Sequence, residues 1–278
     1  MVKKIIACAD IHIRNLEGLD DLQEILQSFI KKCKSIVAKE ESPDDVRIVV
    51  GGDLFESKIN TSNESSLAAG WFLRELNKIC KTVVFAGNHD LVLYNLQRVD
   101  SITPLFQIGN YENVTYLDSE LGYQSGYLVD DNVVWCLYSI FDEYSRPDVD
   151  EIKIRYPGKK LIGLVHGDVN GASMYNGRVT ENGLDAGIFD GLDFVIAGHI
   201  HKRQEIKKNG VRVVYCSSMK QKDFGESITQ HGFVLWTLGE DEDTYEFVDV
   251  KSPGCGYYSF SVNAVTDIEE NKEQLLNL

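Results

Sequence analysis

Thr82-Val-Val-Phe-Ala-Gly-Asn-His-Asp90 is the stretch of this sequence from which the fold can be argued outward. Its first part, Thr82–Ala86, is a short β-branched and apolar run of the kind that forms buried strands. Its second part, Gly87–Asp90, places an amide, an imidazole and a carboxylate directly after that strand. Because loops at the carboxyl ends of parallel strands assemble binding sites, the stretch predicts both a strand and a candidate site.

The same arrangement recurs along the chain. Five segments with metal-type ligands each follow a run that predicts a strand: Asp10-Ile-His12, Gly51-Gly-Asp53, Gly87-Asn-His-Asp90, Val165-His-Gly167 and Gly198-His-Ile-His201. Five of the six histidines lie in these segments, and only His231 does not. A single Asp-x-His or His-x-His is more often surface or core polarity than a metal site. All five in this order favour a metal centre, although the glycines before Asp53, Asn88 and His199 are also typical of plain turns.

The runs between these segments predict two sheets. Residues 19–37 carry apolar side chains at helical spacing. Thr61 or Ser62 can cap a second helix that ends near Ile79. This alternation of strand and helix builds a parallel sheet with helices on its faces. Beyond Asn110 strand runs dominate, so a second sheet is expected. Two mixed sheets packed face to face with outer helices, an α/β or α+β fold, account for the whole order.

The composition fits one large domain. The chain has 278 residues, of which 43% are hydrophobic, enough to bury one substantial core. We expect residues 1–250 to form this domain, and a turn-rich break at Lys251–Gly256 to precede a further strand, Tyr257–Val262. The apolar run Ile5–Ala9 is too short for an export signal or a membrane span, so we expect a soluble, cytoplasmic protein with no membrane partner. The six scattered cysteines contain no C-x-x-C pair and predict ordinary buried thiols.

The charge argues against a protein whose whole surface binds nucleic acid, since the net charge is −15. One stretch is strongly positive, with Lys202, Arg203, Lys207, Lys208, Arg212, Lys220 and Lys222 against the single acidic residue Glu205. A local basic face for a polyanion is one interpretation. A solvated hairpin with lysines on its outer face is an equally good one.

The residue types of the five segments indicate which metals would bind. Carboxylate, amide and imidazole ligands without thiolate suit Mn²⁺, Fe²⁺ or Zn²⁺ rather than a closed structural zinc site. Residues two apart on an extended segment point to the same side, so Asp10 with His12, and His199 with His201, can reach one cavity. An aspartate such as Asp53 can bridge two ions about 3.5–4 Å apart, the spacing of two-metal phosphoryl-transfer sites.

The order D-x-H, GD, GNH(D/E), H, GH-x-H resembles the signature of the calcineurin-like metallophosphoesterases. The resemblance implies a four-layer αββα sandwich and two divalent ions, of which we expect Mn²⁺. One ion would be held by Asp10, His12, Asp53 and His201, and the other by Asp53, Asn88, His166 and His199. His89 would bind no metal and would act over the scissile phosphate, as a general acid or as a donor to transition-state charge. For Asp90, a cap or loop role and an orienting role toward His89 both stay open.

The flanking residues narrow the resemblance. Gly52-Asp-Leu-Phe-Glu56 is similar to the GDLFD segment of SbcD-type nuclease subunits of double-strand-break repair complexes. Protein phosphatases usually read GD-x-VDRG there, and that arginine is absent. Further segments look like the same family, especially its bacteriophage recombination-endonuclease branch: Gly198-His-Ile-His-Lys-Arg-Gln204, Val214-Tyr-Cys-Ser-Ser218, Asp223-Phe-Gly-Glu226 and His231-Gly-Phe233. Ser217 stands where that branch has glycine, so we expect an altered backbone approach to DNA there. The resemblance covers about residues 1–260.

This narrower resemblance implies a two-metal-dependent DNA exo/endonuclease subunit that acts in recombination or double-strand-break processing. Its partners would be DNA, contacted by Lys202, Arg203, Lys220 and Lys222, and an SbcC-type ABC ATPase. Residues 91–108 match the stretch through which SbcD-type subunits form homodimers, and an ordinary buried helix and loop is the alternative for them. Residues 251–278 would be the start of a C-terminal capping region that looks truncated. For a phage-encoded chain, the cytoplasm would be that of the host.

Two alternatives stay open. One is a phosphatase or phosphodiesterase that acts on a small nucleotide or a phosphoprotein, since the five segments do not select a substrate. The other, from a different class, is a non-catalytic subunit that binds DNA ends through its metal site. The second is less favoured because such an anchor has no need of the non-ligand His89.

Overall fold

The computed structural model describes residues 1–15, 18–142, 144–208, 210–251 and 256–257, and these form two six-stranded mixed sheets. The first has the order β12-β11-β1-β2-β3-β4, with β1 (Lys4–Cys8), β2 (Val46–Gly51), β3 (Thr82–Phe85), β4 (Val114–Tyr116), β11 (Gly232–Thr237) and β12 (Thr244–Asp249). The second has the order β5-β6-β7-β8-β10-β9, with β5 (Gly126–Asp130), β6 (Val133–Tyr138), β7 (Lys160–His166), β8 (Phe194–Gly198), β9 (Gln204–Lys208) and β10 (Val211–Tyr215). Each sheet contains four adjacent parallel strands, β1 to β4 in the first and β6, β7, β8 and β10 in the second. Their carboxyl ends therefore meet along one edge of each sheet.

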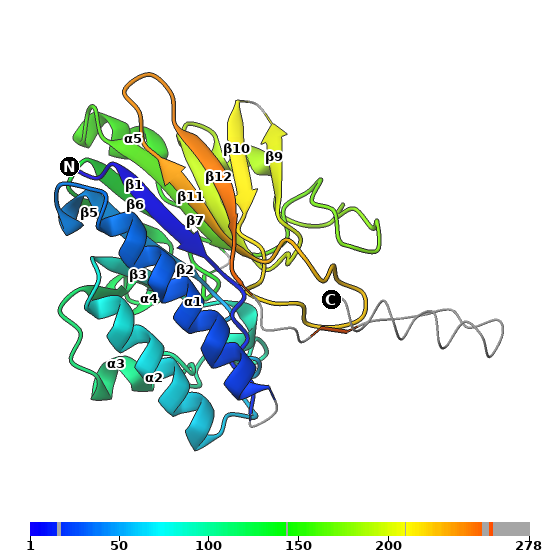
Figure 1. The fold of residues 1–278 in the computed structure, drawn as a ribbon. Coiled ribbons are helices and arrows are strands. Elements are labelled where there is room, and N and C mark those ends of the chain that lie inside the picture. Colours follow the sequence, from blue (N-terminus) through cyan, green and yellow to red (C-terminus); the bar gives the residue numbers. More distant parts are fainter. Residues whose placement is uncertain (16–17, 143, 209, 252–255, 258–278) are drawn as a thin grey trace, which may run out of the picture.

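Helices cover the outer faces of the two sheets. The α-helices are α1 (Leu19–Val37), α2 (Asn63–Asn77), α3 (Thr103–Ile108), α4 (Leu117–Glu120) and α5 (Val149–Arg155). Short 3-10 helices occur at η1 (Pro43–Asp45), η2 (Asn88–Asp90) and η3 (Ala186–Phe189). Figure 1 shows α1 and α2 side by side over the sheet that contains β1, β2 and β3. Ser62 caps α2 through its hydroxyl, which accepts a hydrogen bond from the backbone N–H of Ser65, as the sequence predicts.

Three apolar clusters fill the spaces between the four layers. On β1 the side chains alternate, so that Ile6 packs against the helices and Ile5 packs between the sheets. Phe194 of the second sheet stacks on Trp236 of the first, with ring centroids 3.7 Å apart. The third cluster lies between the second sheet and its outer cover, where Ile152 of α5 and Phe189 of η3 are buried. The four-layer αββα sandwich that the sequence predicts is therefore confirmed.

The segment 91–108 differs from a continuous helix. Only Thr103–Ile108 is helical, and the helix begins there because the Asp100 carboxylate accepts the backbone N–H groups of Ile102 and Thr103. Several apolar side chains of the segment are exposed, among them Leu93, Tyr94, Leu96, Val99 and Ile108. Tyr94 is 84% exposed and Ile108 is 88% exposed, whereas Leu91, Val92 and Ile102 are buried. The segment is therefore only partly buried, and both the homodimer interface and the ordinary helix and loop stay predictions.

Three smaller predictions can also be compared with the fold. Cys8, Cys33, Cys80, Cys136 and Cys216 are buried and unpaired, as predicted. Among the described residues, none of the helices combines the length and the apolar character that crossing a bilayer requires. Apart from Tyr257, the predicted strand Tyr257–Val262 lies outside the described residues, and so does most of the predicted capping region 251–278.

Candidate metal centre

The five predicted segments converge where the two sheets meet. Asp10 and His12 follow β1, Asp53 follows β2, and Asn88 follows β3 by three residues. From the second sheet, His166 ends β7, while His199 and His201 follow β8. All seven predicted ligands therefore come from carboxyl ends of parallel strands, and the structure brings them into two neighbouring groups.

The first group centres on two imidazoles that face each other. The Nε2 atoms of His12 and His201 lie 3.0 Å apart. Asp10 Oδ1 is 3.9 Å from Nε2 of His201, and Asp53 Oδ2 is 3.7 Å from Nε2 of His12. Asp10, His12 and His201 can together hold one ion.

The second group lies on the other side of Asp53. Asn88 Oδ1 is 2.8 Å from Nδ1 of His199 and 3.1 Å from Nε2 of His166. Asp53 Oδ2 lies 3.2 Å from the same Nε2 of His166. One carboxylate oxygen of Asp53 thus lies against His12 in the first group and His166 in the second, which is the position a bridging ligand requires.

Three acceptor atoms of the second group, two oxygens and one nitrogen, face one another. Their protonation shows whether a cation fits between them. His166 Nδ1 lies 2.8 Å from the Gly51 carbonyl, so that nitrogen must carry the proton. In the neutral ring Nε2 then presents a lone pair toward Asn88 Oδ1 and Asp53 Oδ2, neither of which can donate. A divalent cation satisfies all three lone pairs, so the residues fit the metals that the resemblance implies.

The pKa values of the metal-free chain agree with this geometry. Burial opposes charge on His166, but the nearby Asp53 carboxylate outweighs it and raises the imidazole pKa to about 9, so that a proton stands in for the cation. Burial also tends to raise the pKa of Asp53, yet charged His166 outweighs it and holds that pKa below its usual value. Burial raises the pKa of Asp10 to about 6 and lowers the pKa of His12 to about 4.

The backbone at the ligands is unusual. Asp10, His12, Asp53 and His199 have φ angles of 54°, 52°, 51° and 95°, in the left-handed region that side chains other than glycine rarely adopt. Asp10 and His12 do reach one cavity, but not because they alternate on an extended segment, so the geometric reason given by the sequence pattern is wrong. Strained ligands of this kind are typical of functional sites.

The glycines before the ligands are required by close contacts. A Cβ atom on Gly87 would lie 2.2 Å from Oδ1 of Asp53, and one on Gly52 would lie 2.3 Å from Nδ1 of His166. Gly52 also has a φ angle of 84°. These glycines are therefore more than plain strand-end turns, because any side chain there would displace a ligand.

His89 lies outside both ligand groups. Its side chain is 33% exposed, and its Nε2 is 4.0 Å from Oδ2 of Asp53. Its Nδ1 lies 2.5 Å from the Glu56 carbonyl, which can only accept, so Nε2 faces the site either with a lone pair or as a donor of the charged ring. His12, Glu56 and His89 also form a possible ligand group, but His12 already directs its Nε2 toward His201 and Glu56 lies behind its Nδ1.

Asp90 and Asp118 support the loop that carries Asn88 and His89. The buried Asp90 carboxylate accepts backbone N–H groups from Leu54, Phe55 and Gly87, while the His89 ring is fixed by Glu56 instead. Asp90 is thus a loop aspartate. The buried Asp118 accepts the backbone N–H of Ala86 at 2.8 Å and the hydroxyl of Ser139 at 2.5 Å, which joins the end of β3 to the end of β6.

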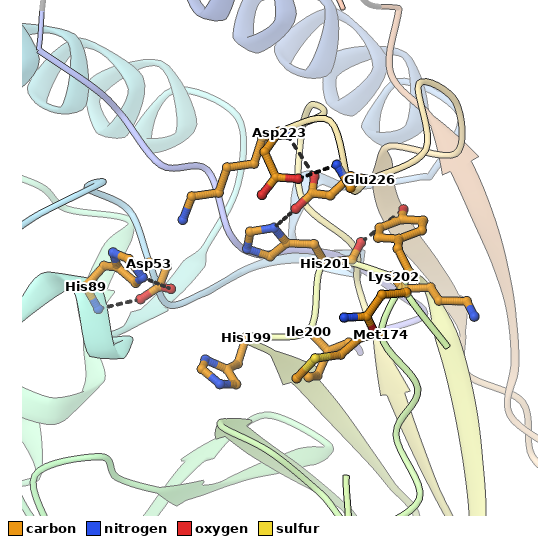
Figure 2. Close-up of a pocket in the computed structure, with 13 residues that line it drawn as sticks. Asp53, His89, Met174, His199, Ile200, His201, Lys202, Asp223 and Glu226 are labelled. Carbon is orange, nitrogen blue, oxygen red and sulfur yellow. Dashed lines mark hydrogen bonds and ion pairs between the residues drawn. The ribbon is translucent and has the colours of Figure 1, made fainter. Parts of the chain in front are cut away.

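A cavity of about 450 Å³ opens over the metal-type ligands. Figure 2 shows Asp53, His89, His199 and His201 around it. Of the predicted DNA-binding residues, Lys202 and Lys222 line this cavity. Arg203 instead pairs with Asp249 and lies over the Phe247 ring, and Lys220 is near Gly18.

The rest of the basic stretch belongs to the β9–β10 hairpin. Lys207 and Lys208 on β9 are exposed and pair with Glu205 and Asp185. Arg212 on β10 lies over the Trp236 ring. The hairpin lysines are thus solvated, as one interpretation expects, whereas Lys202 and Lys222 border the cavity. The interpretation as a basic face for a polyanion stays a prediction.

Three of the four imidazoles in the two groups have an acidic second partner that sequence reasoning missed. Glu226 Oε1 is 2.5 Å from Nδ1 of His201, and Glu56 Oε2 is 3.2 Å from Nδ1 of His12. Asp168 Oδ2 is 3.7 Å from Nε2 of His199. Both glutamates end segments that carry the family resemblance, which is the signal that could have found them, and Asp168 follows His166 by two residues.

The comparisons with known proteins agree with this centre. The family model of the calcineurin-like phosphoesterases matches residues 3–203, a range that includes all seven ligands and His89. The chain belongs to the calcineurin-like phosphoesterase family. Members of this family are metal-dependent hydrolases of phosphate esters, and the two ligand groups here are the corresponding candidate metal positions.

Relatives of this calcineurin-like phosphoesterase include an uncharacterised protein, R555, of Acanthamoeba polyphaga mimivirus. It is 32% identical over 260 residues, which are 90% of the chain but only 18% of R555, so the chain spans about a fifth of that relative. Among solved structures, GAP50, the anchor in the inner membrane complex of Plasmodium, aligns with a TM-score of 0.52 and 13% identity over 89% of this chain and 84% of its own. The calcineurin-like phosphoesterase YfkN of Bacillus subtilis aligns with a TM-score of 0.45 and 15% identity over 99% and 98%. The likeness to GAP50 concerns the fold alone.

Proposed function

We propose that the chain is a two-metal DNA nuclease subunit, an exo/endonuclease that hydrolyses backbone phosphodiesters in recombination or double-strand-break processing, with Mn²⁺ as its metal. The observation that carries the proposal is the shared Asp53 carboxylate between two ligand groups, with His89 beside them but outside both. A metal anchor without catalysis has no use for a non-ligand imidazole at that position.

Bound ions would supply positive charge that polarises phosphoryl oxygens and makes an attacking water more acidic. The chain's own residues hold the ligands in place and present His89. Because the Glu56 carbonyl keeps the proton on Nδ1, His89 directs Nε2 at the space beside Asp53. From there the charged ring can donate a proton to a leaving oxygen or a hydrogen bond to developing charge.

A DNA substrate is supported by the surroundings of the centre. The cavity is open, and Lys202 and Lys222 border it. The carboxylates of Asp53, Asp223 and Glu226 line it as well, so the positive charge for a polyanion would come mainly from the bound ions. Two divalent ions would add four positive charges within about a Debye length, roughly 8–10 Å. The segment Gly52–Glu56 adds the resemblance to SbcD-type nucleases.

The proposed assembly includes an SbcC-type ABC ATPase and a second copy of the chain. The exposed apolar side chains of residues 91–108, such as Tyr94 and Ile108, favour a protein interface there. A cavity of about 590 Å³ between α2 and α3 adjoins them, lined in part by Leu67, Leu105 and Ile108.

A phosphatase or phosphodiesterase that acts on a small nucleotide or a phosphoprotein is the second candidate. The open cavity of about 450 Å³ accepts a mononucleotide as readily as a DNA backbone. Only substrates can separate the two candidates, because the ligand groups serve both reactions equally.

The test uses purified chain, Mn²⁺ or Mg²⁺, and end-labelled linear duplex and single-stranded DNA. We expect Mn²⁺-dependent nucleotide release, which His89→Ala reduces by at least about 10²-fold while Mn²⁺ binding persists. Asp53→Asn is the matched ligand variant, and it should lose both binding and cleavage. Cleavage by His89→Ala at the wild-type rate would contradict the role of His89. Intact DNA with hydrolysis of aryl phosphate esters, also in the presence of an SbcC-type ATPase, would favour the second candidate.

A further inference from the structure

A loop that contributes no metal ligand contacts the ligands of one group. We name Gln221–Glu226 the brace loop. Its last residue, Glu226, is largely buried and places Oε1 2.5 Å from Nδ1 of His201. The other carboxylate oxygen accepts the backbone N–H of Lys222 at 2.7 Å, which fixes the carboxylate in this direction. Figure 2 shows Glu226 behind His201, on the side away from Asp53.

The same loop also reaches the second imidazole of that group. Lys222 Nζ lies 3.5 Å from Oε1 of Glu56, whose Oε2 lies 3.2 Å from Nδ1 of His12. Arg14 joins the two sides, since its guanidinium donates to the Lys222 carbonyl at 3.1 Å and lies 3.6 Å from Oε2 of Glu56. The brace loop therefore holds His201 directly through Glu226, and it reaches His12 only through the ion pair between Lys222 and Glu56.

The second group has different support. His166 donates from Nδ1 to the Gly51 carbonyl, and His199 has Asp168 3.7 Å from its Nε2. In the described part of the chain, the interactions of His166, His199 and Asn88 involve no residue of the brace loop. The two metal positions thus depend on different elements of the fold.

We propose that Glu226 is a positioning residue for His201, and that the brace loop sets the metal affinity of the position formed by Asp10, His12, Asp53 and His201 but not of its neighbour. A carboxylate that accepts from the non-ligating nitrogen fixes the tautomer and orientation of a ligand imidazole and makes it a stronger base. Loss of such a partner typically weakens metal binding by about 10–100-fold. The inference rests on the proposed two-metal centre.

Each position can be measured alone in the full chain. His166→Ala removes a ligand of the second group only, so the position formed by Asp10, His12, Asp53 and His201 keeps all its ligands. His12→Ala removes a ligand of that position and leaves the second group complete. We expect Glu226→Ala to weaken Mn²⁺ binding by about 10–100-fold in the His166→Ala background, and by less than about 2-fold in the His12→Ala background. Calorimetric titration gives the affinities, and the six-line electron paramagnetic resonance signal of bound Mn²⁺ reports whether its ligand field has changed.

Two further variants separate positioning from general effects. Asp223→Asn removes one negative charge from the same loop and should leave both affinities unchanged. The exposed Asp223 carboxylate accepts the backbone N–H of Gly225 and, within the described part of the chain, contacts no metal-type ligand. Glu226→Gln keeps the size of the side chain and should give an intermediate loss, which also covers the case in which Glu226→Ala does not fold. Equal losses in both backgrounds, or none in either, would overturn the inference while the proposed function stood. Failure of both backgrounds and the wild type to bind any divalent ion would instead count against the proposed function.

Discussion

At the scale of single residues, the centre depends on backbone conformations that are rare outside glycine. Four of its seven ligands, Asp10, His12, Asp53 and His199, have φ angles between 51° and 95°. Each such residue costs on the order of 1–3 kcal/mol, which the surrounding sheets must offset. The conformation of these residues is therefore held by the surrounding structure rather than by local preference.

Ser217 adopts the same kind of conformation without being a ligand, with a φ angle of 82°. It is buried, and its hydroxyl contacts the carbonyls of Ser218 and Gln230. The resemblance places glycine at this position, and the φ angle gives a reason for glycine that does not involve DNA. The prediction of an altered approach to DNA here stays untested.

The strain at Ser217 can be measured with two variants. Ser217→Ala keeps the left-handed backbone and loses the hydroxyl, so we expect the free energy of unfolding to fall by about 1–2 kcal/mol. Ser217→Gly loses the same hydroxyl but relieves the strain, so it should be more stable than Ser217→Ala by about 1 kcal/mol. Urea unfolding in the presence of EDTA measures both. Equal stabilities of the two variants would show that the backbone here is unstrained.

The sequence predicted the ligand residues because their types and their order at strand ends are local features. It did not predict Glu226, Glu56 or Asp168 as partners of the imidazoles. Glu226 lies 25 residues from His201, and only the tertiary fold brings them into contact. A single acidic residue in a loop carries no local pattern that distinguishes it from a solvated one.

At the scale of elements, strands were easier to predict than the segment after η2. Alternation and β-branched runs identify strands directly, whereas several apolar side chains of residues 91–108, such as Tyr94 and Ile108, suggest burial yet are exposed. The start of α3 had a local signal, since Asp100 caps it and Pro104 lies in its first turn. Whether the other side chains of residues 91–108 are exposed depends on which elements of the fold pack against them. The spacing of apolar residues along the sequence does not reveal this.

Asp118 of α4 makes the junction between β3 and β6 sensitive to pH. Burial raises its pKa from 3.8 to about 6, with a smaller effect in the same direction from Asp100, and hydrogen bonds from Ser139 and Ala86 act in the opposite direction. The folded state therefore binds a proton that the unfolded state has released. The stability from this group is complete below about pH 4 and is lost as the pH rises through 6.

A shift of about two pKa units is worth about 3 kcal/mol in full, and we expect about 2 kcal/mol of it to be lost between pH 4.5 and 7.5. Asp118→Asn resembles the protonated carboxyl, because its amide can accept from Ala86 and donate to Ser139. The difference in unfolding free energy between wild type and Asp118→Asn, measured in urea with EDTA at each pH, should move in favour of the variant as the pH rises. A difference that does not vary with pH would contradict this assignment.

At the scale of the whole molecule, the candidate centre joins the two sheets. Asp10, His12, Asp53 and Asn88 belong to the first sheet, and His166, His199 and His201 belong to the second. An ion bound in either group therefore links the halves of the sandwich, and unfolding must release it.

Divalent ions should consequently stabilise the entire domain. At a free Mn²⁺ concentration of about 100 times the dissociation constant, one site adds about 2.7 kcal/mol to the free energy of unfolding. We expect the urea midpoint of the wild type to rise in Mn²⁺ relative to EDTA, and Asp53→Asn to lose most of that rise. A rise of the same size in Asp53→Asn would mean that the ions bind elsewhere.

The brace loop is hydrogen-bonded to Tyr257 through Gln221. The side-chain amide of Gln221 accepts the backbone N–H of Tyr257 at 2.7 Å and donates to its carbonyl at 3.0 Å. If the brace loop sets metal affinity, these two hydrogen bonds are thermodynamically coupled to the ion. The factor by which docking of Tyr257 strengthens Mn²⁺ binding then equals the factor by which Mn²⁺ strengthens the docking of Tyr257. A molecule that binds Tyr257 only when it is released from Gln221 would then weaken Mn²⁺ binding without touching the metal centre.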